Sequence, residues 1–216
     1  MYTRIHLGIK DAGVTPHETL RRDILSGHIA PGTLLSQTDL AARFGVSRIP
    51  IRDTLQALAA ERLVTVIPNK GARVIELDRL ALREIFELRE LLECDLIDRA
   101  TLCAQPSDHA DVEYALRKSE LEAGRTGWRE GDWLFHSSMY KVAKRDRQID
   151  IIRELRDACE IHAAHYDDLM QDTPRWLDQH RHIFAAFRSG NPEKTRHLLA
   201  THIRESGQHL LSSMDR

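Results

Sequence analysis

The chain has 216 residues, of which 42% are hydrophobic and 30% are charged, a composition typical of a soluble globular protein with one or two domains. No stretch approaches the roughly 18 apolar residues that a transmembrane helix needs, so we expect no membrane insertion. The N-terminus lacks the basic and then apolar pattern of a secretory signal, which predicts a cytoplasmic protein. The three cysteines form no C-x-x-C pair, which argues against a disulfide framework and against a thiolate zinc site.

The formal net charge of -2 is unevenly distributed along the chain. Residues 1–75 carry ten Lys and Arg against six Asp and Glu, whereas the remainder carries 21 against 27. A basic N-terminal part followed by an acidic remainder indicates that only the N-terminal part contacts a polyanion such as nucleic acid.

The first 76 residues predict three helices and a β-hairpin. A helix over residues 17–26 ends at Gly27, and a shorter one begins after Ser36 and ends at Gly45, because serine caps helix starts and glycine takes the left-handed conformation that ends helices. A third helix runs from residue 48 to about residue 61. Two β-prone runs, 63–67 and 72–76, flank a turn at 68–71. This layout predicts a winged helix-turn-helix domain over residues 1–76.

From Asp78 onward the sequence shows helical patterns only, and we expect an all-helical domain over residues 77–216, so that the whole protein is mostly α-helical. Capping residues and apolar stripes predict six helices, which begin at Asp78, at Ser107, near residue 128, near residue 147, at Thr173 and at Asn191. The fourth of them is expected to reach about residue 169. Proline follows both Thr173 and Asn191, where the first helical position tolerates it. The short connections favour an antiparallel bundle.

The third helix of the N-terminal domain carries candidate DNA-reading residues. Arg48 and Arg52 are four residues apart and therefore share a face. Ser47 stands at the N-cap, but Pro50 has no N–H, so the usual cap bond to that position cannot form and the helix start is left with amides that suit a phosphate. A guanidinium group can read guanine or hold a phosphate, and the sequence leaves both roles open.

Residues 34–41 (LLSQTDLA), residues 44–55 (FGVSRIPIRDTL) and the turn at 68–71 (PNKG) together resemble the DNA-binding domain of the GntR family of bacterial regulators. The resemblance covers about residues 14–76. It implies DNA contacts from a helix-two residue, three recognition-helix residues and the wing tip, namely Thr38, Ser47, Arg48, Arg52, Lys70 and Gly71. Two positions depart from the family pattern, because Arg62 stands where glycine is usual and Ile49 where threonine is common.

In the predicted helical domain, Asp132 and His136 are spaced i and i+4, so both side chains lie on one helical face and can converge on one metal ion. His180 falls on the apolar stripe of its helix, whereas His182 falls among polar positions. His202 also falls on an apolar stripe. A single inward histidine is usually an ordinary core residue, but four inward ligands on three helices favour a metal site.

This pattern, with Glu87-Leu88-Arg89 and Leu92-Glu93 on the first helix of the domain, resembles the FCD ligand-binding domain of the FadR subfamily over residues 78–213. The resemblance implies a divalent metal ion held by Asp132, His136, His180 and His202, together with a small carboxylate effector. Zinc is the preferred ion, with nickel, iron and manganese as alternatives. Arg89 would bind the effector through a charge-assisted hydrogen bond. His162 is expected either to line the effector pocket or to belong to the plain core.

The sequence therefore predicts a transcription regulator, namely a homodimeric repressor of a catabolic operon, whose affinity for operator DNA is changed by the effector. Release of the DNA on effector binding is the expected direction, but the sequence itself does not show it. We keep two alternatives. In one, a metal-responsive regulator, the ion itself is the signal. In the other, the protein is a helical metalloenzyme in which the metal activates water. Against this alternative, the sequence lacks the Glu-x-x-His pairs of di-iron bundles, and an enzymatic role would not explain the basic N-terminal part.

Overall fold

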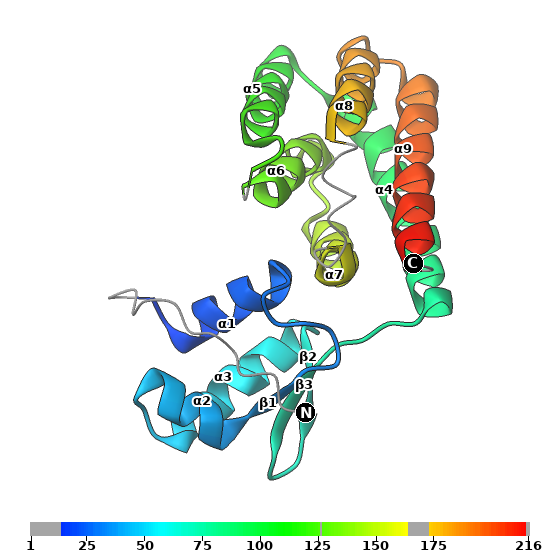
Figure 1. The fold of residues 1–216 in the computed structure, drawn as a ribbon. Helices are drawn as coiled ribbons and strands as arrows, with labels where there is room; N and C mark the ends of the chain where they lie inside the picture. Colours follow the sequence, from blue (N-terminus) through cyan, green and yellow to red (C-terminus); the bar gives the residue numbers. More distant parts are fainter. Residues whose placement is uncertain (1–13, 126, 164–172, 215–216) are drawn as a thin grey trace.

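The protein is described here by a computed structural model, which covers residues 14–125, 127–163 and 173–214. These residues form an N-terminal head of three helices and a small sheet, and a larger helical domain of six helices (Figure 1). In chain order the head contains α1 (Pro16–Leu25), β1 (Leu34–Ser36), α2 (Gln37–Phe44), α3 (Arg48–Ala60), β2 (Val64–Ile67) and β3 (Gly71–Val74). The helical domain contains α4 (Arg79–Cys103), α5 (Pro106–Glu122), α6 (Trp128–Lys141), α7 (Asp146–Ala163), α8 (Thr173–Arg188) and α9 (Pro192–Ser213).

The three predicted helices of the head are confirmed, and side-chain caps explain where α1 and α2 begin. Thr15 and Glu18 form a capping box at the start of α1, in which each side chain binds the other residue's backbone N–H. Ser36 accepts a hydrogen bond from the Asp39 N–H at 3.4 Å and caps α2. Gly45 ends α2 with a left-handed φ of 67°.

The predicted hairpin is part of a three-stranded antiparallel sheet with the order β1-β3-β2. Strand β1 was not predicted from the sequence, because three residues are too few to show an alternation of apolar and polar side chains. The strand depends on pairing with β3, which is distant in the sequence. Gly71 is buried in this sheet with a φ of 149°, and a Cβ there would lie 1.9 Å from the Leu35 carbonyl oxygen. Glycine is therefore required at position 71 to let two strands approach closely.

The six predicted helices of the helical domain are present, with one corrected start. The prediction that Ser107 caps α5 is wrong: the N-cap is Gln105, Pro106 follows it, and the Asp108 carboxylate accepts from the Gln105 N–H at 2.8 Å. Asn191 caps α9 as predicted, accepting from the Lys194 N–H at 3.0 Å. The end of the fourth predicted helix, residues 164–169, lies outside the described residues.

Two clusters of buried hydrophobic residues stabilise the described parts of the chain. One fills the helical domain and includes residues from all six of its helices, with Ile149 and Ile152 contributed by α7, and the other fills the head. Ile161 of α7 is fully buried and packs in the cluster of the head, so α7 belongs to both parts of the molecule. The boundary predicted between residues 76 and 77 falls in the segment between β3 and α4.

Candidate metal centre and DNA-binding surface

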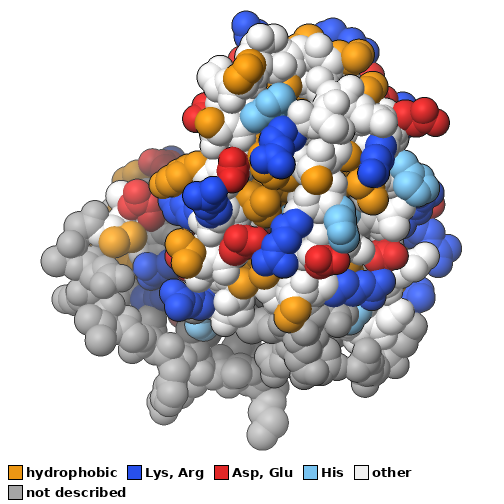
Figure 2. All heavy atoms as spheres, turned by 90° about the horizontal axis from the view of Figure 1, so that it is seen from above, with side chains coloured by type: hydrophobic (Ala, Val, Ile, Leu, Met, Phe, Trp, Pro, Cys, Tyr) orange, Lys and Arg blue, Asp and Glu red, His pale blue; other side chains and the backbone are white. Residues whose placement is uncertain are grey.

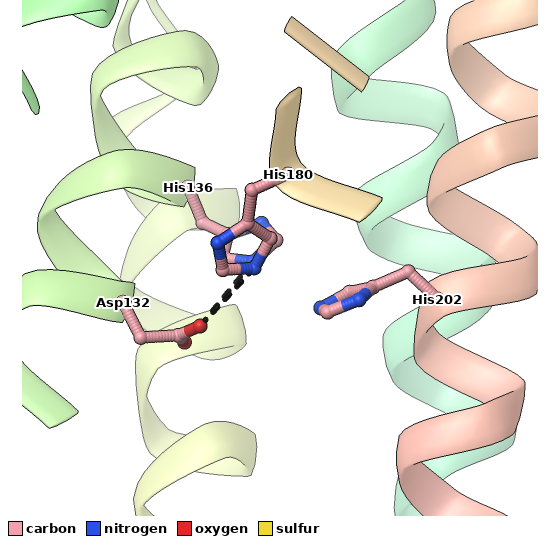
Figure 3. Close-up of side chains that lie close together, drawn as sticks. All are labelled: Asp132, His136, His180 and His202. Carbon is pink, nitrogen blue, oxygen red and sulfur yellow. Dashed lines mark hydrogen bonds and ion pairs between the residues drawn. The ribbon is translucent and has the colours of Figure 1, made fainter. Parts of the chain in front are cut away.

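Four potential metal ligands converge inside the helical domain (Figure 3). Asp132 and His136 lie one turn apart on α6, His180 lies on α8, and His202 lies on α9. One ligand atom from each residue lies within 4.8 Å of the others. His180 Nε2 is 3.3 Å from Asp132 Oδ1 and 3.2 Å from His136 Nε2. The structure thus brings together all four residues that the sequence singled out.

The three histidines of this cluster are buried and uncharged. Burial lowers the pKa of His180 to about 4, and the pKa values of His136 and His202 lie well below the usual range for the same reason. Arg156 adds to the effect by disfavouring further positive charge near each ring. An uncharged imidazole keeps one nitrogen lone pair, which is the form that binds a metal ion.

The proton on His136 is placed by its neighbours. Tyr140 donates its hydroxyl proton to Glu93, since a carboxylate can only accept. Although burial alone would raise it, the pKa of Glu93 is held below the usual range by Arg89 and Arg156, which keep this side chain ionised. The Tyr140 oxygen is then left to accept from His136 Nδ1 at 3.3 Å. The lone pair of His136 is therefore on Nε2, the nitrogen that faces the cluster.

Two buried arginines lie beside the cluster. Arg89 Nε donates to Glu93 Oε1 at 2.8 Å, and Arg156 Nη1 donates to Glu93 Oε2 at 3.1 Å. Arg156 also donates through Nη2 to Asp132 Oδ2, which leaves Asp132 Oδ1 toward His180. Arg89 was predicted from the sequence as an effector-binding residue, whereas Arg156 was not predicted. A signal was available, because Arg156 lies on the apolar stripe of α7 with Ile149, Ile152 and Cys159.

The donor set fits a divalent transition metal ion. Three uncharged imidazoles and one carboxylate oxygen are the ligand types that zinc accepts, and nickel, iron and manganese accept them as well. Two of the ligands are oriented by hydrogen bonds, because His136 Nδ1 donates to the Tyr140 oxygen and Arg156 donates to Asp132, as outer contacts do at metal sites. Metal binding by these residues remains a prediction.

His162, the second predicted effector residue, contacts the connection between the two parts of the molecule. Its Nδ1 donates to the Ala158 carbonyl oxygen at 2.9 Å, and its Nε2 accepts from the Leu77 N–H at 2.9 Å. The Nδ1 bond fixes the ring on α7, and the Nε2 bond holds the segment between β3 and α4 against this helix. Effector binding by His162 remains a prediction.

The predicted DNA contacts lie mainly on α2, α3 and the β2–β3 hairpin, on the side of the head that faces away from the helical domain (Figure 1). Five of these side chains are exposed: Thr38, Ser47, Arg48, Arg52 and Lys70. As expected from Pro50, the N-cap of α3 has no side-chain hydrogen bond. Gly71 differs from the other five because it is buried against β1, and a DNA contact from its backbone remains a prediction.

The end of the helical domain that lies farthest from the head has a different surface. Lys and Arg side chains are interspersed there with Asp, Glu and hydrophobic side chains (Figure 2). DNA backbones are bound by concentrated positive charge, so this end of the molecule is less suited to DNA than the head. No helix within the described residues is long and apolar enough to cross a bilayer.

A winged helix-turn-helix head joined to a helical domain with a buried polar site defines a class of bacterial DNA-binding regulators. The model of the GntR family of bacterial regulatory proteins matches residues 17–74, and the FCD domain model matches residues 84–205. The chain therefore belongs to the GntR family, in the branch with a C-terminal FCD domain, and it is a DNA-binding transcription regulator.

Characterised relatives extend along most of the chain. The HTH-type transcriptional repressor RspR of Escherichia coli (strain K12) is 27% identical over 192 residues, which cover 88% of this chain and 84% of that protein. The gluconate operon transcriptional repressor of Bacillus licheniformis is 28% identical over 197 residues, with 88% and 81% covered. The crystal structure of a GntR transcriptional regulator from Rhodococcus sp. RHA1 superposes with a TM-score of 0.75 at 26% identity, covering 91% of this chain and 95% of that one.

Proposed function

We propose that this regulator is a repressor whose affinity for operator DNA is changed by a small carboxylate bound at a metal centre in the helical domain. The observation that carries the proposal is the convergence of Asp132, His136, His180 and His202 beside two buried arginines. Such a site offers a cation and guanidinium groups to an anion in a region shielded from water. Two relatives named as repressors support the sign of the regulation.

The head binds operator DNA through α3 and the wing. Arg48 and Arg52 lie exposed on one face of α3, with the uncapped amides at its start beside them, and Lys70 extends from the wing tip. One head offers few phosphate contacts, whereas two heads can match a pseudo-palindrome. We therefore propose a homodimer that acts on the chromosome in the cytoplasm. Exposed Leu88, Leu91 and Leu102 on α4 are apolar side chains that a second copy would cover.

The metal ion would be held by Asp132, His136, His180 and His202, and zinc suits this donor set best. A bound ion supplies a positive centre that attracts a carboxylate oxygen. Arg89 would bind the same carboxylate. Because Arg89 is paired with Glu93 in the structure, the effector would compete with the Glu93 carboxylate for this guanidinium. Competition of this kind gives the site two arrangements, which regulation requires.

Helix α7 is the element that would connect the site to the head. On its inner face, Arg156 binds Asp132 and Glu93. The adjacent residue, Asp157, accepts from Arg21 Nη2 of α1 at 3.1 Å. A change at the metal centre that moves Arg156 would therefore also move Asp157, the next residue along the chain, which contacts Arg21 of the DNA-binding head.

Three further contacts link α7 to the head and to the segment that connects the head with α4. Ile161 is fully buried in the hydrophobic cluster of the head, and His162 accepts the Leu77 N–H of the connecting segment. Arg62 at the end of α3 lies 3.3 Å from Glu154 of α7. Rotation or translation of α7 would therefore move the head as a body, and in a dimer it would change the spacing of two recognition helices.

The proposal is tested by a DNA-retardation assay with an operator duplex selected from a random pool by the metal-loaded protein. Zinc is titrated alone and together with mono-, di- and tricarboxylic acids of two to six carbons. We expect metal-loaded protein to hold the DNA and one class of acid to release it. If zinc alone controls DNA binding and no acid changes it, the ion itself is the signal and the carboxylate proposal fails.

An enzymatic role for the centre has less support, because both matching family models describe parts of transcription regulators. The same acid panel provides a check, since an enzyme would convert one of the acids during incubation with the metal-loaded protein. Chromatography that recovers every acid unchanged would agree with an effector role.

A further inference from the structure

Gln179 of α8 links the metal-ligand cluster to the surface of the helical domain. Its Oε1 lies 2.8 Å from His202 Nδ1, and its Nε2 donates to Glu205 Oε2 at 2.5 Å. Glu205 Oε2 also accepts from Arg175 Nη2 at 2.7 Å. Exposure rises along this path, from 5% for His202 to 29% for the Glu205 side chain and 54% for that of Arg175. A continuous chain of hydrogen bonds therefore runs from solvent to a candidate ligand.

The chemistry of the groups fixes the direction of each bond in this chain. A carboxylate accepts hydrogen bonds and donates none, so the amide nitrogen of Gln179 must face Glu205. The amide oxygen of Gln179 then faces His202 and requires a proton on His202 Nδ1. A neutral histidine with its proton on Nδ1 has its lone pair on Nε2, the ring nitrogen left for the other three ligands (Figure 3).

We propose that Gln179 is a positioning residue that holds His202 in the Nδ1–H tautomer, with Nε2 aimed at Asp132, His136 and His180, and that it thereby sets the affinity of the centre for a divalent ion. This inference rests on the metal centre proposed above. Metal-binding histidines generally donate their second N–H to an acceptor, and loss of that acceptor weakens metal binding about 10- to 100-fold.

The ligands of the cluster differ in their outer contacts. Tyr140 orients His136 and Arg156 orients Asp132, and both of these partners are buried in the core. Among the described residues, no hydrogen-bond partner is found for His180 Nδ1. Gln179 is only half-buried, and its other partners are at the surface. It is therefore the outer contact that can be changed with the least effect on the core.

The tautomer is tested directly on the metal-free protein. Long-range nitrogen–proton NMR correlations of ¹⁵N-histidine-labelled protein distinguish Nδ1–H from Nε2–H rings. We expect His202 to be Nδ1–H in the wild type and in the matched control Gln208→Leu, an exposed position on α9. In Gln179→Leu the Nε2–H form should become populated. A His202 ring that stays entirely Nδ1–H in Gln179→Leu would overturn the proposal.

Metal affinity is measured by competition between the protein and a zinc-binding indicator. Gln179→Leu should bind Zn²⁺ about 10- to 100-fold more weakly than the wild type and than Gln208→Leu. The double variant Gln179→Glu/Glu205→Gln keeps an acceptor for His202 and a donor between the two positions, so it should restore at least wild-type affinity.

The two proposals fail in different ways. Equal Zn²⁺ affinity in Gln179→Leu and wild type would contradict the positioning role while leaving the metal centre intact. A wild-type protein that binds no Zn²⁺, nickel, iron or manganese would contradict the metal centre and, with it, the effect of Gln179 on affinity. The tautomer measurement would still decide whether Gln179 orients His202.

Discussion

At the scale of single residues, the recognition-helix arginines give the clearest test of the DNA-binding surface. Arg48→Ala and Arg52→Ala should each weaken binding to the selected operator, because both side chains are exposed on one face of α3. Loss of an arginine that reads guanine should weaken the free energy of DNA binding by about 1–3 kcal/mol and relax specificity at one base pair. Loss of an arginine that holds a phosphate should instead reduce the slope of log affinity against log salt concentration by about one unit.

The measurement is a binding titration at several salt concentrations with operator and mismatched duplexes. Arg147→Ala is the matched control, since this arginine is exposed at the start of α7. Wild-type affinity in both Arg48→Ala and Arg52→Ala would remove α3 as the recognition helix.

Substitution of two histidines of α8, one buried and one exposed, tests which side chains bind the metal ion. His180 is fully buried and faces Asp132, whereas the His182 side chain is 64% exposed and lies near Asp178. After purification with zinc, elemental analysis should find about one ion per chain in His182→Ala and much less in His180→Ala. Equal zinc in the two variants would contradict the assignment of the ligands.

The ligand positions were predictable from the sequence, whereas their partners were not. Helical periodicity places Asp132, His136, His180 and His202 on inward faces, since the period of a helix is local information. Tyr140 and Gln179 contribute hydrogen bonds across helices, and periodicity carries no information about which helix lies opposite. Their roles became visible only when the helices were packed against one another.

At the scale of elements, the end of α3 shows a conformation that arginine adopts only at a cost. Arg62 has a left-handed φ of 58°, and the Arg62 and Leu63 N–H groups bond to the Ala59 and Leu58 carbonyls in a Schellman motif. This explains why the family pattern has glycine there. Arg62→Gly should be more stable to urea than Arg62→Ala by about 1 kcal/mol, because only glycine relieves the backbone strain.

Alanine is the appropriate reference for this test, since both variants remove the contact between Arg62 and Glu154 equally. Equal free energies of unfolding in the two variants would show that the left-handed conformation is not strained. The departure from glycine at Arg62 is visible in the sequence, whereas the left-handed φ that explains it is visible only in the fold.

Elements whose signals are local were predicted well, and those that depend on distant partners were not. The capping residues Ser36, Asp78 and Asn191 each begin a helix as expected. Strand β1 was missed because its backbone bonds to β3, which lies more than 30 residues further along the chain. The start of α5 was misplaced because Gln105, an uncommon cap, precedes a proline.

Helix α7 gives a second prediction at this scale. Asp157→Asn keeps the size of the side chain but removes its charge toward Arg21, an ion pair at 3.1 Å with side chains 9% and 31% exposed. The factor by which the acid weakens DNA binding should fall about five-fold, which corresponds to a loss of about 1 kcal/mol of coupling free energy between the two sites. The affinity of the acid for the DNA-free protein should change little.

The control is Asp150→Asn, which removes a charge from an exposed position of the same helix. Full release of DNA by the acid in Asp157→Asn would exclude this ion pair from the coupling between the metal centre and the head.

At the scale of the whole molecule, the head and the helical domain are connected by the segment between β3 and α4, and α7 packs against both of them. The fold class and the family agree with the expectation from the sequence, because caps, stripes and the recognition-helix motif are all local patterns. The participation of Ile161 in the cluster of the head was not predictable, since an apolar residue on a helix does not reveal which core it enters.

The central claim is that one protein molecule couples acid binding at the metal centre to DNA binding at the head. Thermodynamic linkage requires that operator DNA changes the affinity for the acid by the same factor as the acid changes the affinity for DNA. Isothermal titration of the releasing acid into zinc-loaded protein, with and without saturating operator duplex, measures that factor directly. We predict weaker binding of the acid in the presence of DNA, by the factor seen in the retardation assay; an acid affinity that DNA leaves unchanged would contradict the claim.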